Sequence, residues 1–188
     1  DEVLAEAERV ITWYSLLYVE PRPEVWRVYF LGLCAGMEDD QVQGVARRMG
    51  FSRHQEESFL ALRHSIRDIA QRIFEWEYRK GLHSELFFLL KDLPLEGVLY
   101  LMARNPKETV QRSISLFLTT LRTLRIEVAG EDLKAMGLTP GPRYAQTLRA
   151  VTAAMLDGKA TCRAEQMALA RRLAQGEVGL DWMPESSS

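Results

Sequence analysis

Apolar residues recur at intervals of three and four along nearly the whole chain, a spacing that places them on one face of an α-helix. No stretch alternates apolar and polar positions in the way that a half-buried strand does. Prolines, glycines and capping residues interrupt the pattern at intervals and divide the chain into successive helices. The sequence therefore predicts an all-α protein built as a multi-helix array.

Two of these apolar stripes are longer than the others. The first belongs to residues 52–80, opens with a capping box at Ser52–Gln55 and is interrupted at Gly81. The second belongs to residues 106–125. Because both stripes repeat over about four turns or more, these segments are predicted to be the two central helices. Ile69 and Phe117 are expected to be buried in the core of the helical array.

Shorter helices are predicted on both sides of this pair. They are expected over about residues 4–18, 25–35, 39–49, 82–90, 94–104, 142–157 and 161–175, with Thr161 as the cap of the last one. The final residues, 185–188, read as a polar tail that frays.

The segment Gly130–Tyr144 reads as a short helix, a rigid turn and the start of another helix. Gly137 is placed to end the first helix in a left-handed conformation. Pro140 and Pro142 restrict the backbone on both sides of Gly141, and Pro142 suits the first position of the next helix. We expect Gly141 to need a backbone conformation that a branched residue resists.

This corner is also a candidate phosphate site. The backbone N–H groups of Arg143 and Tyr144 would have no partner within their helix, and the positive end of the helix dipole and the arginine both favour an anion. Lys159 and Arg163 flank the start of the following helix and form a second candidate of the same kind. The alternative is that the corner only shapes the fold and that these bases are solvated surface charges.

The net charge of −2 is unevenly distributed along the chain. Residues 1–40 carry nine acidic and three basic residues, whereas residues 41–129 carry ten acidic and fourteen basic ones. Residues 130–175 carry four acidic and seven basic residues. The middle and late segments could therefore face a polyanion, and the first segment could not.

Motifs for catalysis or metal binding are not found in the sequence. The three histidines and two cysteines are not spaced as metal ligands, and no glycine-rich phosphate loop or nucleophile elbow occurs. Cys34 and Cys162 both fall in apolar helical patterns, so we expect two buried free thiols in a reducing compartment. With no secretion signal and no long apolar run, we expect a cytoplasmic protein that does not enter a membrane.

The corner motif also carries a resemblance. The residues Gly130-x-Asp132-Leu133-x-x-x-Gly137-x-x-Pro140-Gly141-Pro142, followed by Thr161-x-x-x-Glu165-x-x-x-Leu169-Ala170, resemble the C-terminal end of bacterial tRNA nucleotidyltransferases and poly(A) polymerases. The stretches 9–17 and 46–52 resemble the helical C-terminal half of the longer members of that family.

The resemblance implies a division of the chain and a partner. Residues 1–129 would form a helical body and residues 130–188 a helical tail, which in the family grip the acceptor stem and elbow of tRNA. The family's catalytic head carries a Gly-Ser loop and a metal-binding Asp-x-Asp, and neither occurs in this sequence. We therefore expect no cofactor in this chain and no activity of the chain alone, while the parent enzyme would use Mg²⁺ with ATP or CTP.

Two hypotheses from different classes follow. In the first, the chain is the tRNA-binding part of a nucleotidyltransferase, with Gly141, Arg143, Tyr144, Lys159 and Arg163 as RNA-binding residues and the head as its second partner. In the second, it is a helical protein–protein interaction or dimerisation module without RNA contact, and self-association as a homo-oligomer stays open. The acidic N-terminal segment and the Trp13 and Trp26 helices support the second hypothesis.

Overall fold

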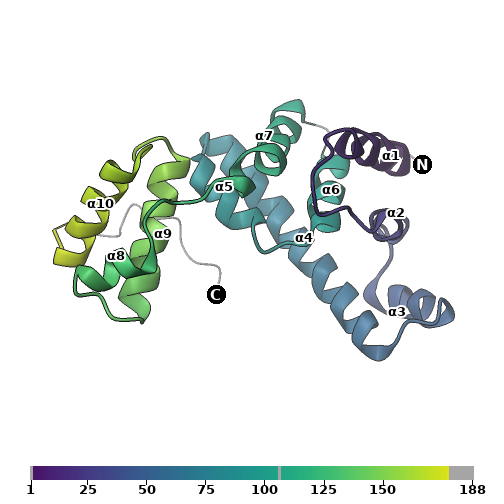
Figure 1. The fold of residues 1–188 in the computed structure, drawn as a ribbon. Helices are drawn as coiled ribbons and strands as arrows, with labels where there is room; N and C mark the ends of the chain where they lie inside the picture. The colour runs from purple at the N-terminus through teal and green to yellow at the C-terminus, as the bar shows by residue number, and fades with distance from the viewer. Residues whose placement is uncertain (1, 106, 178–188) are drawn as a thin grey trace.

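The fold is taken from a computed structural model that describes residues 2–105 and 107–177. These residues form ten α-helices and one short 3₁₀ turn, and no strand occurs among them (Figure 1). The elements are α1 (Glu2–Ser15), α2 (Val25–Leu33), α3 (Asp39–Arg48), α4 (Arg53–Arg79), α5 (His83–Leu90), α6 (Leu95–Arg104), α7 (Glu108–Thr119), η1 (Leu121–Thr123), α8 (Gly130–Ala135), α9 (Pro142–Leu156) and α10 (Arg163–Gln175). The predicted all-α class is confirmed.

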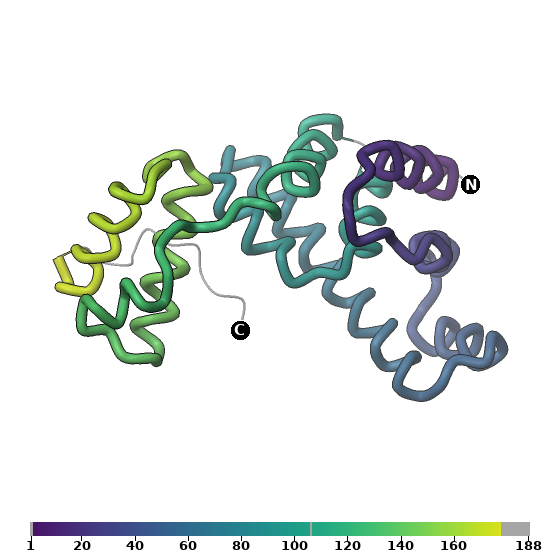
Figure 2. Tube along the Cα trace, in the orientation of Figure 1, coloured from purple at the N-terminus to yellow at the C-terminus, as the bar shows by residue number. Residues whose placement is uncertain are grey.

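The helices form an elongated array rather than a sphere (Figures 1 and 2). Helix α4 crosses the middle of the array, with α3 at one of its ends and α5 and α7 near the other. Helix α6 packs against α1, α2, α4 and α7, and α5 contacts α9. Helices α8, α9 and α10 form the far end of the array in Figure 2.

The larger hydrophobic core lies along α4 and α6. Helix α4 buries Phe59, Ile66, Ile73 and Trp76 on one face. Helix α6 is buried on nearly all sides, at Glu96–Leu101 and Ala103. Phe117 of α7 is also buried in this core, as the sequence predicted.

A second, smaller core joins the last three helices. It contains Val128, Leu133, Leu138, Ala150, Val151, Ala170 and Leu173. Leu156, at the end of α9, belongs instead to the larger core. Helix α9 thus takes part in both cores, and the predicted body–tail boundary at residue 129 stays a prediction.

The two cores are connected by a polar contact as well. The Asp157 carboxylate, directly after α9, accepts hydrogen bonds from the backbone N–H and the hydroxyl of Ser84, at 2.9 and 2.8 Å. Ser84 lies in the first turn of α5, where unpaired N–H groups favour a carboxylate. The Arg149 guanidinium lies 4.1 Å from the centre of the Phe88 ring. Helix α9 therefore binds α5 through burial, a helix cap and a cation–π contact.

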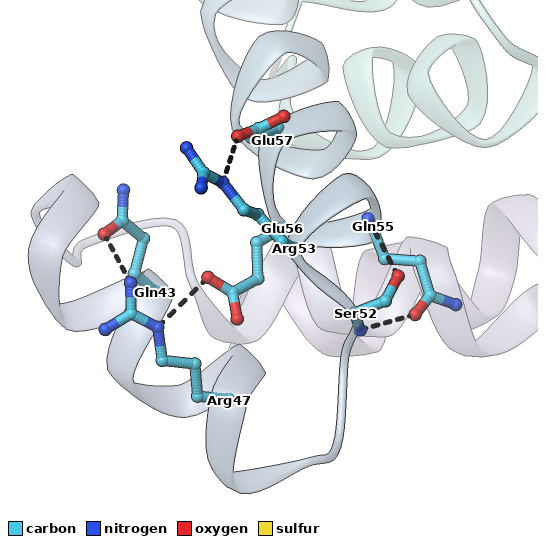
Figure 3. A network of polar contacts seen from close by, with 7 residues as sticks. All are labelled: Gln43, Arg47, Ser52, Arg53, Gln55, Glu56 and Glu57. Atoms are coloured by element: carbon cyan, nitrogen blue, oxygen red, sulfur yellow. Dashed lines mark hydrogen bonds and ion pairs between the residues drawn. The ribbon is translucent and has the colours of Figure 1, made fainter.

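The start of α4 shows how local sequence sets a helix boundary (Figure 3). The Ser52 hydroxyl accepts from the Gln55 backbone N–H, and the Gln55 side chain accepts from the Ser52 N–H. This is the capping box that the sequence predicted. Arg47 of α3 donates to the Glu56 carboxylate at 3.1 Å and so ties the preceding helix to this corner.

The second predicted central helix is shorter than expected. Helix α7 ends at Thr119 rather than near residue 125, and residue 106 lies outside the described residues. The backbone tightens into the 3₁₀ turn, which buries Leu121 and leaves Leu124 39% exposed. Arg122 then donates to the Tyr14 hydroxyl and to the Glu20 carbonyl oxygen. These contacts with Tyr14 and Glu20 hold the turn in place. The apolar pattern of residues 106–125 could not predict them, because their partners lie far away in the chain.

Other expectations need correction at single residues. Helix α1 ends at Ser15, and Tyr18 has a left-handed backbone and is exposed. Ile69, expected in the core, is only half-buried because the buried face of α4 runs through Ile66 and Ile73. The predicted tail at residues 185–188 lies outside the described residues.

The difference between Ile66 and Ile69 gives a test of the α4 register. Ile66→Ala should lower the free energy of unfolding by about 2–5 kcal/mol, because the side chain is 2% exposed and leaves a cavity. Ile69→Ala removes the same atoms from a half-buried position and should cost about 1 kcal/mol. Urea unfolding of both variants measures this, and equal losses would contradict the assigned register.

Candidate nucleic-acid interface

The candidate interface is built on the corner between α8 and α9. The Asp132 carboxylate of α8 accepts a hydrogen bond from the backbone N–H of Ala129, at 2.7 Å, and so caps its own helix. The next residue, Leu133, is fully buried in the smaller core. The Gly-x-Asp-Leu part of the motif thus combines a helix cap with an anchor in the core.

Helix α8 ends as the sequence predicted. Gly137 has φ +85°, in the left-handed region. Its N–H donates to the Lys134 carbonyl oxygen, and the Leu138 N–H donates to the Leu133 carbonyl oxygen. This pair of bonds is a Schellman motif, completed by contact between Leu133 and Leu138 in the smaller core.

The side chain of Tyr144 closely approaches Gly130. A Cβ atom added at Gly130 would overlap with the Tyr144 hydroxyl oxygen. The Tyr144 ring is half-buried and packs on the smaller core. The ring therefore fixes the distance between the start of α8 and the first turn of α9, which gives Tyr144 a packing role.

Gly141 does not have the special conformation that we expected. Its φ and ψ of 164° and −171° are extended backbone, and an added Cβ would meet only the Thr139 carbonyl oxygen, at 3.9 Å. The expectation that a branched residue would disturb the corner is therefore wrong. The two flanking prolines restrict the turn, and the residue between them carries no conformational strain.

The start of α9 differs electrostatically from the other helix starts. Pro142 occupies the first turn, Gly141 provides no side-chain cap, and the first turn holds no acidic residue. Each of the other helices in the described part of the chain has an acidic residue in its first turn or directly before it. The N–H groups of Arg143 and Tyr144 thus lie at a positive helix end that no carboxylate of its own first turn offsets.

Arg143 is exposed, and its guanidinium reaches toward the end of α10. Its Nη2 donates to the Ala174 carbonyl oxygen at 3.5 Å, a long hydrogen bond. This contact places the start of α9 beside the last turn of α10, where Arg171 and Arg172 are exposed. The sequence pattern does not single out these two arginines, because only the antiparallel packing of α9 and α10 brings them to this end.

The second candidate phosphate site lies at the other end of α9. Lys159 is exposed in the turn after this helix, and Arg163 begins α10. Helix α9 has fifteen residues and, at a rise of 1.5 Å per residue, is about 22 Å long. The two candidate phosphate sites lie at its opposite ends. The structure therefore does not bring the five predicted residues together into one site.

Arg163 is engaged within the chain. Its Nη2 donates to both carboxylate oxygens of Asp132, at 2.8 and 3.0 Å, and its Nη1 donates to the Glu127 carbonyl oxygen. The Glu165 carboxylate accepts from the Thr161 N–H and hydroxyl and from the Cys162 N–H, and these bonds lower its pKa. A carboxylate thus already occupies the start of α10 and would repel a phosphate.

Two sequence expectations about this turn need correction. The residue directly before α10 is Cys162 rather than Thr161, although Thr161 still takes part in the cap. Cys162 is exposed, not buried, because the turn places it outside the helix. Cys34 is buried as expected, and burial raises the pKa of its thiol.

The described residues show neither a metal-binding cluster nor a membrane-spanning helix. Among the described residues, no group of three or more histidine, cysteine or acidic side chains is arranged to hold a metal ion. Across the same part of the chain, no helix combines the length and the apolar character that crossing a membrane requires.

The contact between Gly130 and Tyr144 can be tested by a double-mutant cycle. Gly130→Ala should destabilise the chain by about 1–3 kcal/mol through overpacking against the tyrosine hydroxyl. In a Tyr144→Phe background, which lacks this hydroxyl, the same change should cost measurably less. Thermal or urea unfolding of the four proteins gives the coupling, and a coupling near zero would show that the ring lies elsewhere.

Comparison with known proteins finds a clear relative. The chain is 36% identical over 179 residues to the A-adding tRNA nucleotidyltransferase of Geobacter sulfurreducens. The aligned region covers 92% of this chain but only 20% of that protein's length. No family profile and no solved structure matches the chain. The resemblance inferred from the corner motif is thereby confirmed: over most of its length, this chain is similar to one part of an A-adding tRNA nucleotidyltransferase.

Proposed function

We propose that this chain is the tRNA-binding helical part of a tRNA nucleotidyltransferase. The observation that supports this most strongly is the 36% identity over 92% of the chain to an A-adding tRNA nucleotidyltransferase. The addition of nucleotides would be carried out by a catalytic head elsewhere in the parent protein, with Mg²⁺ and ATP or CTP. The chain alone would then bind tRNA without extending it.

The proposed RNA contact is the start of α9 and the arginines beside it. A positive helix end without a carboxylate in its first turn and an exposed arginine suit a phosphate, and neither feature depends on base sequence. Double-helical RNA is recognised mainly through its shape, phosphates and 2′-hydroxyls, so such a surface would suit a tRNA stem. Arg171 and Arg172 would add to the positive potential at this end of the α9–α10 pair.

The roles of the five predicted residues differ within this proposal. Arg143 would contact the phosphate, with the backbone at Gly141 allowing close approach and Tyr144 holding the helix start in place. Arg163 is bound to Asp132, so its contribution would be to hold α8 against α10. Lys159 stays a separate predicted contact at the opposite end of α9.

A protein-interaction function is the second candidate, and exposed apolar side chains favour it. Trp26 is 46% exposed and Leu33 is 57% exposed, both on α2. Trp13 of α1, which also suggested this function, is half-buried and therefore exposes part of its side chain. If this surface mediated self-association, sedimentation of the chain would show a concentration-dependent dimer, and Trp26→Ala would weaken it.

The proposed RNA contact predicts a specific salt dependence. Arg143→Ala should weaken tRNA binding by about three- to tenfold, because it removes one charge-assisted phosphate contact. It should also lower the slope of log affinity against log salt by about one unit. Filter binding over a range of salt concentrations measures both quantities, and circular dichroism checks that the helices persist.

The matched control is Arg112→Ala. Arg112 is an exposed arginine on α7 that pairs with Glu108, far along the chain from the corner. The Arg112→Ala substitution removes the same charge as Arg143→Ala and should leave the slope of log affinity against log salt unchanged. If the two variants change tRNA affinity and the salt slope equally, the start of α9 does not contact RNA and has only a structural role.

A further inference from the structure

A small polar pocket lies between α2, α4 and α6. Helices α2 and α6 lie away from the α8–α9 corner, which is at the other end of the array (Figure 1). Its lining includes Leu31 and Ala35 at the end of α2, Arg63 and Arg67 of α4, and Tyr100 and Arg104 of α6. The cavity has a volume of about 70 Å³. It is large enough for several waters or one small oxyanion and too small for a nucleoside.

Arg63 is buried in this pocket without full compensation. The residue is 8% exposed, and its Nη2 donates to the Met37 carbonyl oxygen at 2.7 Å. Its Nη1 has no hydrogen-bond partner among the described residues. A buried donor of a charged group that makes no hydrogen bond is costly, so it indicates a ligand or another partner at that atom.

The nearest carboxylate offsets this charge only in part. Asp39 Oδ1 lies 4.0 Å from Arg63 Nη1, beyond hydrogen-bonding distance. The same carboxylate is bound by His64 Nε2 at 2.7 Å, and this hydrogen bond lowers the pKa of Asp39. Asp39 is 43% exposed and is shared between the two bases.

The rest of the lining adds donors. Arg67 and Arg104 are exposed, and no ion pair with a carboxylate within 4 Å is found for either of them in the described part of the chain. Tyr100 is 3% exposed. Burial raises the pKa of its hydroxyl, and the charge of Arg104 and a hydrogen bond from its side chain lower this pKa by a smaller amount. The protonated hydroxyl can still donate its own hydrogen. Three guanidinium groups and a phenol thus surround one small cavity.

From this arrangement we propose that the pocket binds a phosphate group, with Arg63 at its floor and Arg67 and Arg104 at its mouth. Arginine guanidinium groups match the geometry of phosphate oxygens and form strong charge-assisted bonds with them. The phosphate is either the free ion or a phosphodiester of an RNA backbone. Binding of the free ion does not depend on the function proposed above.

The experiment uses the full 188-residue chain and inorganic phosphate as the first probe. Phosphate should raise the melting temperature more than chloride at equal ionic strength, since a ligand of the folded state stabilises it. The double variant Arg67→Gln/Arg104→Gln should weaken phosphate binding by about tenfold or more, because it removes two charge-assisted contacts. Both residues are exposed, so the variant should keep its fold, which circular dichroism verifies.

The matched control is Arg53→Gln/Arg112→Gln, which removes the same charge from exposed arginines that pair with Glu57 and Glu108. It should bind phosphate like the parent chain. A second arm repeats the comparison with a blunt RNA duplex without terminal phosphates, which offers only phosphodiesters.

The two arms identify the source of the phosphate. A selective loss of inorganic phosphate binding supports a site for the free ion, and a selective loss of duplex binding supports a site for the RNA backbone. If the two double variants bind both probes equally, the proposal is overturned. Failure of the Arg143→Ala test would leave either result intact, since that residue lies at the other end of the array.

Discussion

Burial of one face of α4 is the interaction on which the rest of the array depends. This helix has 27 residues and is therefore about 40 Å long. Its buried residues, from Phe59 to Trp76, contact the core over most of that length. Helices α3, α5, α6 and α7 all pack on α4, so loss of this face would remove the one helix that all four of them share.

An array built along one long helix exposes many helix ends. In a compact bundle these ends gather at two opposite faces, whereas here they are distributed along the molecule. At most helix starts, a carboxylate in or directly before the first turn offsets the positive end of the helix dipole. At α5, the Asp157 carboxylate, directly after α9, does so as well. The start of α9 lacks such a carboxylate, which is why it is the helix end best suited to an external anion.

Helix α9 determines how this end is held relative to the larger core. Its first turn is fixed by Tyr144 packing over Gly130, and its last turn contributes Leu156 to the larger core. Asp157 then caps α5 directly after the helix ends. A single helix thus spans the distance between the corner and the α5 contact, so the spacing between these two regions follows from its length.

Local features of the fold could be read from the sequence because their causes are local. The capping box at Ser52 and the left-handed stop at Gly137 each involve residues within a few positions of one another. The same holds for the apolar period, which identified nearly all the helices. The early end of α7 was missed because it depends on Arg122 reaching Tyr14, which lies 108 positions away in the chain.

What the sequence by itself determined was therefore the helices, their caps, the shape of the corner and the resemblance that the corner motif carries. Only the tertiary structure decided which charges remain available. It paired Arg163 with Asp132, brought Arg171 and Arg172 beside Arg143, and buried Arg63 between three helices. The physical reason is that periodicity shows which face of a helix is apolar, but the partner of a charged side chain is set by packing between distant segments.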